Sequence, residues 1–286
     1  HVVEDDSDFD YLVATPWFYV TREAFYDFLE RAPGHITVMY GCHEAIAPDF
    51  MLFDYYIGLD TVPGSDRTVK LPYLRHHLQE VHGGKEGLDA HALLASKTGF
   101  CNFIYANRKS HPNRDAMFYK LSAFRFVNSL GPHLNNTPGD GHRAEDWYAS
   151  SIRMKKPYKF SIAFENAWYP GYTSEKIVTS MLAGTIPIYW GNPDISREFN
   201  SASFINCHDF PTLDDAAAYV KKVDEDDNLW CEIMSRPWKT PEQEARFLEE
   251  TERETVKLYK IFDQSPEEAR RKGDGTWVSY YQRFLK

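Results

Sequence analysis

The sequence lacks the features that mark several classes of protein. Its cysteines stand far apart and form no CxxC pair, which excludes a zinc-ribbon pattern and a dense disulfide framework; they are Cys42, Cys101, Cys207 and Cys231. We expect isolated buried thiols in a reducing compartment. No apolar run in the printed sequence reaches the roughly 20 residues of a membrane-spanning helix, and no signal-peptide pattern occurs in it.

A surplus of positive charge is also missing. The chain has 32 Lys and Arg against 42 Asp and Glu, a formal net charge of −10. Because phosphate backbones require a basic face, we do not expect nucleic acid as a partner. Any anionic ligand must therefore meet a local positive site. The 15% of aromatic residues suit a carbohydrate- or nucleotide-stacking surface as well as an ordinary core.

What the sequence does have is an alternation of strand-like and amphipathic helical runs. With 286 residues, the chain is long enough for two domains of about 140 residues each. The alternation predicts an α/β fold with parallel sheets. A loop rich in Gly, Pro and Asn, residues 131–142, separates two such runs. We therefore predict two Rossmann-like domains, residues 1–135 and 136–286. The expected strands are 10–15, 35–41, 53–60, 99–107, 158–166, 185–191 and 202–207, and the main expected helices are 21–32, 114–124, 174–184, 212–223 and 240–262.

A charged pair, Glu175 and Lys176, stands at the start of one expected helix, after an aromatic loop containing Gly and Pro. Thr173 or Ser174 can cap this helix. Glu175 suits the helix dipole by about 0.3–1 kcal/mol, whereas a cation in the first turn is mildly unfavourable. An anion docked at the helix start would explain Lys176, because free N–H groups and an ammonium form a phosphate site. From the residues alone, capping and an anion site both remain open.

Residues 158–210 closely resemble the donor-binding motif of the α1,3/4-fucosyltransferases, glycosyltransferase family 10. In that family the run FEN, a variable aromatic loop, GY, a TEK-like triplet and IPIYWG occur in this order. Here the triplet reads Ser174-Glu175-Lys176, with Ser in place of the usual Thr. The fixed spacing over the whole segment makes this match far more specific than a short pattern such as GxGxxG.

The resemblance extends upstream of this motif. Tyr105-Ala106-Asn107, followed by Arg114 before an amphipathic helix, is similar to a family element whose Arg contacts the donor diphosphate. The planar fork of an arginine suits two phosphate oxygens. Without the family, the residue itself would be interpreted as a surface arginine at a helix start.

A third matching segment is HEAIAPDFMLFDYYIGLD, residues 43–60. It resembles the family segment in which a Glu precedes a Pro and an FDY-type strand, and that Glu, here Glu44, is the proposed general base. Two more residues separate Glu44 from the Pro than in the family pattern. Together the resemblances cover about residues 8–215. Family members usually have a further strand-helix unit before the segment matching 10–15. We therefore expect that unit to be missing here or the acceptor domain to be reduced.

The resemblance implies a GT-B fold, with two Rossmann-like domains and a cleft between them. It implies an inverting enzyme that moves L-fucose from GDP-fucose to the 3-hydroxyl of GlcNAc or Glc in an oligosaccharide, forming an α1,3 linkage. The N-terminal domain would bind the acceptor and the C-terminal domain the GDP-sugar. Three alternatives remain open: another GDP-sugar, an α1,4 linkage, and a non-catalytic carbohydrate-binding protein.

The implied roles divide between catalysis and donor binding. Glu44 would act as general base, with Glu175 as the second catalytic candidate because it places negative potential near the developing cation. Arg114, Lys176 and the helix start would hold the diphosphate. Tyr158 and Tyr172 would stack on the base or contact phosphate, or else would be buried strand aromatics. The complete donor-binding set is Asn107, Arg114, Tyr158, Glu165, Asn166, Tyr172, Ser174 and Lys176.

We expect no metal site and no cofactor besides the GDP-fucose donor substrate. Asp6-Ser7-Asp8 has the DxD spacing of another glycosyltransferase fold, but it lies in an acidic leader that we interpret as solvated. The acidic run 224–227 is interpreted as a solvated helix face. The third group, read as helix-surface residues, is His76, His77, Glu80 and His82.

The cellular location and the acceptor-binding residues are predicted only in general terms. The scattered cysteines and acidic charge favour a bacterial cytoplasmic enzyme that builds surface glycans such as lipopolysaccharide, with peripheral membrane association open. The catalytic domain of a Golgi-lumen enzyme is the alternative. Weak candidates for acceptor contact are Trp17, Phe18 and Tyr19.

Overall fold

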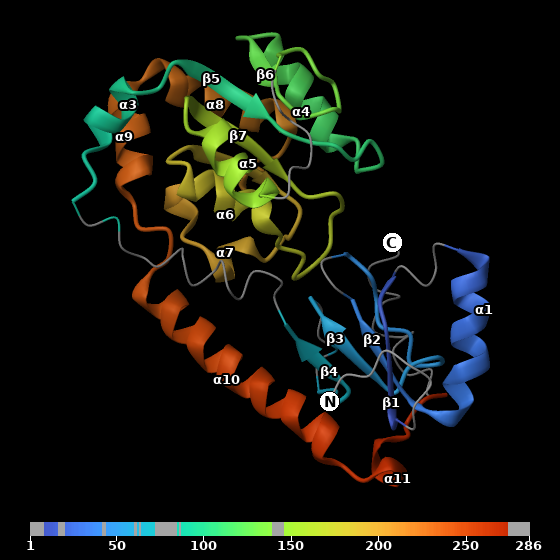
Figure 1. The fold of residues 1–286 in the computed structure, drawn as a ribbon. Helices are drawn as coiled ribbons and strands as arrows, with labels where there is room; N and C mark the ends of the chain where they lie inside the picture. The colour runs from blue at the N-terminus through green and yellow to red at the C-terminus, as the bar shows by residue number, and fades with distance from the viewer. Residues whose placement is uncertain are drawn as a thin grey trace. The chain divides into compact units, whose positions relative to one another are not determined.

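The computed structural model describes residues 9–16, 21–41, 44–59, 62, 64–71, 85, 87–138 and 146–273. The chain divides into two compact units, one made of residues 1–73 and 248–286 and the other of residues 74–247 (Figure 1). Several residues considered above lie outside the described ranges: Asp6, Asp8, Trp17, Phe18, Tyr19, Cys42, His76, His77, Glu80 and His82.

The first unit contains a parallel four-stranded sheet in the order β1-β2-β3-β4. Thr21 caps helix α1, and its hydroxyl accepts a hydrogen bond from the Ala24 N–H at 3.2 Å, as expected for a Thr at this position. The three strands predicted for this part are confirmed. The elements are β1 (Tyr11–Ala14), α1 (Arg22–Arg31), the 3-10 turn η2 (Ala32–Gly34), β2 (Ile36–Tyr40), β3 (Tyr55–Gly58) and β4 (Thr68–Lys70).

The C-terminal part of the chain also belongs to this first unit. It contributes the end of the long helix α10 (Pro241–Asp263) and the short helix α11 (Pro266–Ala269). The Tyr11 hydroxyl donates to the Ile261 carbonyl at 2.7 Å. Asp54, which is fully buried, accepts from the Lys272 N–H at 2.6 Å. These contacts tie the last described segment to the sheet.

The second unit contains a parallel five-stranded sheet in the order β6-β5-β7-β8-β9. The predicted α/β alternation is confirmed here too. Its strands are β5 (Gly99–Phe103), β6 (Val127–Ser129), β7 (Tyr158–Phe164), β8 (Ile186–Trp190) and β9 (Ile205–Asn206). Its helices are α3 (Ala90–Ala95), α4 (Asn113–Ser122), α5 (Trp147–Lys155), α6 (Glu175–Leu182), α7 (Ile195–Glu198), α8 (Leu213–Glu225) and α9 (Asp227–Ser235), with 3-10 turns η3 (Ser201–Ser203) and η4 (Cys207–Asp209).

The strand order of this sheet reverses between β5 and β7. From β5 the chain passes through α4 to β6 on one side, whereas from β7 it passes through α6 to β8 and then β9 on the other. The two connections leave the carboxyl ends of neighbouring strands in opposite directions. Such a switch point opens a crevice in α/β sheets and is their usual ligand site.

The predicted domain boundary at residues 135/136 is wrong. Strand β5 pairs with β7 in register Gly99↔Tyr158, so residues 99–129 share a sheet with residues 158–206. The Gly/Pro/Asn-rich loop 131–142, which suggested a linker, therefore starts and ends inside one unit. The observed boundaries lie at 73/74 and 247/248. Composition misled the prediction because turn residues serve surface loops and linkers equally well.

Two predictions about polar residues have different outcomes. Cys101, Cys207 and Cys231 are buried free thiols, as expected. Asp224, in contrast, is not on a solvated face, because its buried carboxylate lies 2.9 Å from Arg125 Nη1 and 3.2 Å from Lys159 Nζ. A buried carboxylate requires such partners.

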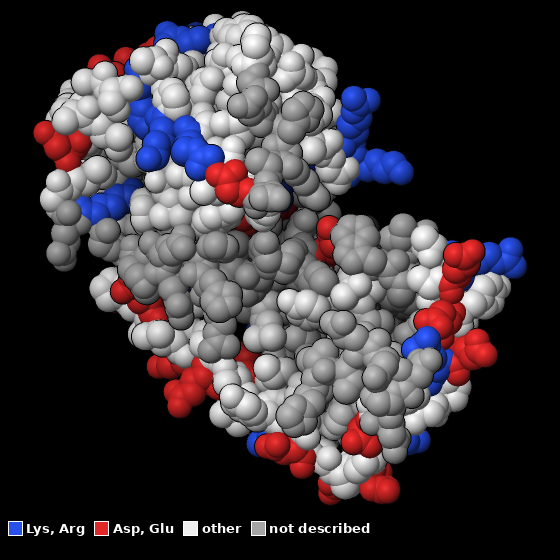
Figure 2. All heavy atoms as spheres, in the orientation of Figure 1, with Lys and Arg blue, Asp and Glu red and all other residues white. Residues whose placement is uncertain are grey.

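The acidic net charge is unevenly spread. On the face drawn in Figure 2, Lys and Arg side chains gather in small groups over the larger unit. Local positive sites are therefore compatible with the negative net charge of the chain. Within the described ranges, no helix is both long enough and apolar enough to span a bilayer.

Candidate functional site

Arg114 is buried at the switch point and not exposed on a helix surface. It lies in the first turn of α4, which follows β5, and has 0% exposure. Its Nη1 donates to the Asn166 side-chain oxygen at 3.1 Å, and Nη2 donates to the Asn107 carbonyl. The guanidinium carbon lies 4.3 Å from the centre of the Tyr105 ring, a cation–π contact. Three of the predicted donor residues are thus brought together.

The charge of Arg114 is only partly compensated. Its Nε has no hydrogen-bond partner among the described residues, and it lies 3.8 Å from the nearest carboxylate oxygen, of Asp115. Burial lowers the pKa of Arg114, although Tyr105 and Asp115 oppose this shift. An arginine remains charged in proteins. The site therefore holds a buried cation with a spare donor, which favours an anionic ligand.

A second cluster joins the end of β7 to the start of α6. The Lys176 ammonium lies 3.1 Å from Glu165 Oε2 and 2.7 Å from the Ser174 hydroxyl oxygen. Glu165 is fully buried and also accepts from the Ser174 N–H at 2.8 Å and the Ser174 hydroxyl at 2.6 Å. Glu175 lies 3.6 Å from the same ammonium. The nearest anionic partner of Lys176 is therefore the Glu165 carboxylate and not a bound ligand.

The capping prediction for Ser174 is half right. Ser174 occupies the N-cap position of α6, but its side chain makes no capping hydrogen bond. Its hydroxyl donates to Glu165 instead, because a buried, charged carboxylate is a strong hydrogen-bond acceptor. The first N–H groups of α6 consequently receive no acceptor from the cap side chain, and a helix start is where anions bind.

The charges of this cluster shift one another's pKa values. Burial lowers the pKa of Lys176, but Glu165 and Glu175 outweigh it and the pKa is raised well above its usual value. Burial raises the pKa of Glu165, with Lys176 opposing. Burial also acts to raise the pKa of Glu175, yet Lys176, backbone N–H donation and Lys155 lower it overall. Lys176 is therefore a permanent cation that organises two carboxylates.

Lys155 is a positioning residue that sequence reasoning missed. It ends α5, is 5% exposed, and its ammonium donates to the Thr179 hydroxyl at 2.5 Å and the Ser180 hydroxyl at 3.2 Å in α6. Burial lowers its pKa to about 7. In sequence it is one of two adjacent lysines before a strand, and nothing there distinguishes it from a solvated surface residue.

The loop before α6 is held by Asn192, which follows β8. Its side-chain oxygen accepts from the Gly171 N–H at 2.9 Å, and its amide donates to the Thr173 hydroxyl at 3.0 Å. Gly191 has φ +151° and approaches Glu165 so closely that an added Cβ would lie 2.5 Å from the Glu165 Cβ. A glycine is therefore required here. The WGN run was visible in the sequence as part of the family motif, without these roles.

The two candidate tyrosines have different positions. Tyr172 is buried beside the cluster, where its phenol acts to raise the pKa of both Arg114 and Lys176. Tyr158 is the first residue of β7, opposite Gly99, at the amino-terminal edge of the sheet. Since a strand rises about 3.3 Å per residue, Tyr158 lies about 20 Å from the carboxyl end of β7. Its prediction as a donor-binding residue is contradicted by this position.

Flat rings at the carboxyl edge come from other residues. The His111 ring lies 4.5 Å from the Trp190 ring, centre to centre, and the Trp190 ring lies 6.0 Å from that of His208. The His111 N–H donates to the Asn166 carbonyl at 2.8 Å, beside the Arg114 contact. IPIYWG in the sequence contains Trp190, but its pairing with His111 depends on tertiary structure.

Glu44 lies in the other unit, just after β2. Its N–H donates to the Gly41 carbonyl at 3.2 Å, its carbonyl accepts from the Ile46 N–H at 2.9 Å, and the residue is half-buried. It therefore follows the carboxyl end of a parallel strand, the usual position for a functional residue in such sheets. Its role as general base stays a prediction. No cluster of three or more potential metal-ligating residues occurs within the described ranges.

Comparison with known proteins places this geometry in a family. Residues 94–270 match the model of the family "Glycosyltransferase family 10 (fucosyltransferase) C-term". The chain belongs to glycosyltransferase family 10. The matched range includes the sheet of the second unit together with Arg114, Glu165 and Lys176, so the family 10 region coincides with the site.

Curated relatives carry several fucosyltransferase names. The chain is 30% identical over 236 residues to the alpha-(1,3)-fucosyltransferase FucT of Helicobacter pylori, which covers 71% of this chain and 48% of the relative. It is 26% identical over 226 residues to the alpha-(1,4)-fucosyltransferase of Arabidopsis thaliana, covering 66% of this chain and 55% of the relative. It is 37% identical over 131 residues to GDP-fucose protein O-fucosyltransferase 3 of Xenopus laevis, covering 44% and 28%. This family 10 chain therefore spans about half or less of the lengths of these relatives.

Solved structures agree with the fold. A crystal structure of an alpha1,3-fucosyltransferase aligns with a TM-score of 0.64 and 27% identity, over 81% of this chain and 70% of that one. An alpha1,3-fucosyltransferase crystallised with GDP-fucose aligns with a TM-score of 0.58 and 24% identity, over 84% and 86%. The predicted GT-B class, with two parallel α/β sheets, is confirmed.

Proposed function

We propose that this protein is an inverting fucosyltransferase that uses GDP-fucose as its donor. The observation that carries the proposal is the placement of Arg114, with a spare Nε donor, at the switch point of the sheet, where Tyr172 acts on both Arg114 and Lys176 of α6. A diphosphate leaving group needs preorganised positive charge and N–H donors. Family membership and the GDP-fucose neighbour support fucose as the sugar.

Each residue of the donor site has a role in this proposal. Arg114 and the N–H groups at the start of α6 contact the diphosphate. Lys176 adds positive potential and fixes Glu165 and Glu175, which accept hydrogen bonds from sugar hydroxyls and stabilise the developing positive charge at the anomeric carbon. The rings of Trp190 and His111 replace Tyr158 as the stacking surface for the base.

The acceptor hydroxyl attacks the anomeric carbon opposite the diphosphate, and its proton passes to Glu44 as general base. Attack from that face inverts the centre and forms an α-fucoside from a β-linked donor. We propose the 3-hydroxyl of GlcNAc or Glc in an oligosaccharide as the acceptor, supported by the name of the Helicobacter pylori relative. The Arabidopsis thaliana relative supports an α1,4 linkage as the second candidate.

The relatives share fucose in their names and differ in what receives it, since one group modifies proteins. The donor part of the proposal therefore has broader support than the acceptor part. The test is GDP release from GDP-fucose in the presence of N-acetyllactosamine, compared with GDP-mannose and with lactose as second acceptor. We expect acceptor-dependent release from GDP-fucose alone. Binding of GDP-fucose without release would favour the non-catalytic alternative.

A further inference from the structure

A cavity of about 570 Å³ lies in the second unit, away from the donor site. Part of its lining comes from the three connections that lead into β5, β7 and β8, which contribute Lys97, Lys156 and Gly184 respectively. Because these strands are parallel, their connections lie together at the amino-terminal edge of the sheet. Lys176, by contrast, is at the first turn of α6, the end of that helix nearest the carboxyl edge. The cavity is therefore a separate site, of a size typical for small-molecule pockets.

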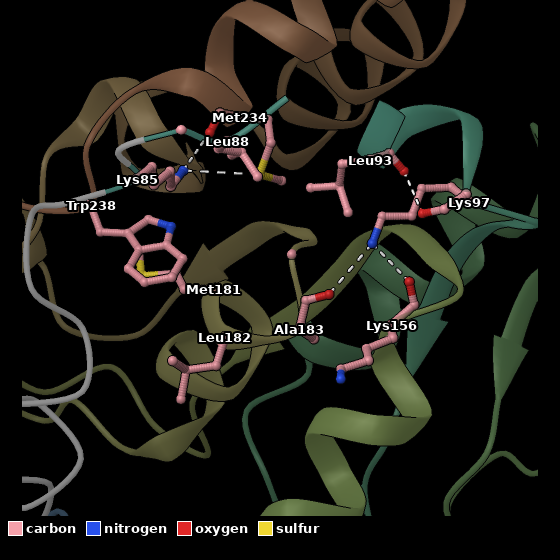
Figure 3. A pocket seen from close by; sticks show the side chains of 13 residues that line it. Lys85, Leu88, Leu93, Lys97, Lys156, Met181, Leu182, Ala183, Met234 and Trp238 are labelled. Carbon is pink, nitrogen blue, oxygen red and sulfur yellow. Dashed lines mark hydrogen bonds between the residues drawn. The ribbon is translucent and has the colours of Figure 1, made fainter. Parts of the chain in front are cut away.

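The rest of the cavity lining is largely apolar. Figure 3 shows the Trp238 ring and Met181 on one side, with Leu88 and Met234 next to them and Leu182 below. An indole face and unbranched thioethers adapt to apolar chains of varied shape. This wall would accommodate a hydrocarbon portion of a ligand.

Lysines project into this lining from two sides. The Lys97 ammonium donates to the Lys156 carbonyl at 2.7 Å and the Ala183 carbonyl at 3.4 Å (Figure 3). The Lys85 ammonium donates to the Met234 carbonyl at 2.6 Å and lies 5.1 Å from the centre of the Trp238 ring. These carbonyls end helices, so capping explains part of the arrangement. Capping leaves further N–H donors on each ammonium.

What capping does not supply is a counter-charge. Within the described part of the chain, no carboxylate forms an ion pair with Lys85, Lys97 or Lys156; the charged group that acts on Lys97 is the like-charged Lys156. Burial alone lowers the pKa of Lys85 to about 7, and burial together with Lys156 lowers the pKa of Lys97 to about 8. Two partly desolvated cations thus stand next to an apolar wall.

We propose that this cavity binds an amphipathic anion, with its headgroup on Lys97 and Lys156 and its apolar chain against Trp238, Met181 and Leu88. An anion at this position supplies the missing counter-charge, and the chain covers the apolar wall. Neither an inorganic anion nor a neutral detergent satisfies both halves of the site. The inference is independent of the proposed donor chemistry, because it uses none of the residues of the donor site.

The experiment is calorimetric titration of the whole chain with decyl phosphate below its micelle concentration. Inorganic phosphate and decyl glucoside serve as probes of the separate halves. We expect decyl phosphate to bind at least about tenfold more tightly than either probe, because each half of the site contributes separately. The Lys97→Met/Lys156→Met double variant should lose about tenfold or more in affinity, the effect of removing charge-assisted contacts.

Controls separate this site from general adsorption and from the donor site. Lys222→Met, on the exposed face of α8, should bind decyl phosphate as the wild type does. GDP titrations on every variant report on the donor site and on folding independently. Equal decyl phosphate affinity in the wild type and the double variant would overturn the proposal, as would equal binding of the three probes.

A pH series on the wild type tests the same proposal if the double variant does not fold. Affinity for decyl phosphate should fall between about pH 7 and about pH 9, because the headgroup contact Lys97, whose pKa is about 8, loses its charge in this interval. The probe itself remains an anion throughout, so its own ionisation does not cause a decrease. An affinity that is constant or rises over this interval would contradict the proposed role of the lysines.

Discussion

The Lys176 ammonium lies 3.1 Å from the Oε2 atom of Glu165, although Lys176 is in the first turn of helix α6 and Glu165 follows strand β7. The Ser174 hydroxyl joins them, 2.6 Å from the carboxylate and 2.7 Å from the ammonium. Lys176 therefore has an internal partner before any ligand binds. Arg114, whose Nε has no hydrogen-bond partner among the described residues, is the cation that keeps a donor for a diphosphate.

The first prediction concerns the stability of this pair. Lys176→Met leaves Glu165 as a buried carboxylate without its cation, and loss of one partner of a buried pair costs about 3–5 kcal/mol. We expect a loss of that order in the free energy of unfolding, measured with urea, together with weaker GDP binding.

The matched control is the double variant Glu165→Gln/Lys176→Met, which removes both charges. It should recover at least about half of the lost stability, because no unpaired buried charge remains. GDP binding should stay weak, since the positive potential is still absent. If the two substitutions lower stability additively, the pair is not coupled and this account of Glu165 is wrong.

Arg114→Lys tests the donor contact with the charge conserved. A lysine cannot reproduce the planar fork that joins Asn166, Asn107 and the diphosphate. We expect GDP affinity to fall by about 10- to 100-fold by calorimetry, the cost of one or two charge-assisted hydrogen bonds. Arg153→Lys, at an exposed position in α5, should leave GDP affinity unchanged. Wild-type affinity in Arg114→Lys would remove Arg114 from the diphosphate site.

Lys155 should make stability depend on pH. Its pKa of about 7 in the folded protein is below the value of about 10.4 expected in the unfolded chain. Between these values the unfolded chain binds more protons, so this group makes the folded state more stable as pH rises from about 7 to about 10, and the penalty is complete below about pH 7.

Removing the ammonium with Lys155→Met should flatten this dependence. The gap in unfolding free energy between the wild type and the variant should change by about 1–3 kcal/mol between about pH 7 and about pH 9. Urea midpoints at both pH values measure it, and Lys222→Met provides the exposed-lysine control. A gap that stays constant would show that Lys155 is protonated throughout and has an anionic partner.

The sequence predicted β7, α6 and β8 because the information for these elements is local. Alternation of β7, α6 and β8 and the spacing of FEN, SEK and IPIYWG are contained in one continuous segment. Pairing across the fold was not predictable in this way. Lys155 reaches Thr179, and Trp190 meets His111, only through packing of separate elements.

Two predictions were wrong because each depends on where residues lie in the sheet, which the sequence pattern does not give. Tyr158 is predicted to stack on the base or contact phosphate, but it begins strand β7, and only the carboxyl end of that strand reaches the switch point. The domain boundary was placed at the Gly/Pro-rich loop, whereas strand pairing between β5 and β7 decides which residues share a unit. The bacterial cytoplasmic location stays a prediction from composition.

Glu44→Gln tests the base without disturbing donor binding. Glutamine keeps the shape of the side chain and cannot accept a proton from the acceptor hydroxyl. We expect turnover to fall by about 100-fold or more, the usual contribution of a general base, while GDP affinity stays at the wild-type value. Turnover near that of the wild type would move the base elsewhere, with Glu175 the first candidate.

Metal removal distinguishes two ways of neutralising the diphosphate. The proposal assigns this task to Arg114, Lys176 and the start of α6, so fucosyl transfer should persist after dialysis against EDTA. Initial rates with and without added Mn²⁺ measure it, and we expect a change of less than about threefold, well under 1 kcal/mol of barrier. A strict requirement for Mn²⁺ would assign the diphosphate charge to a metal instead.

The most direct test of the central claim is the structure of the product. The chain is incubated with GDP-fucose and N-acetyllactosamine, and the linkage and anomeric configuration of any new sugar are determined by NMR. We predict α-fucose on the 3-hydroxyl of GlcNAc, with formation strongly reduced in Arg114→Lys. A β-fucoside, or no product from a chain that binds GDP-fucose, would contradict it.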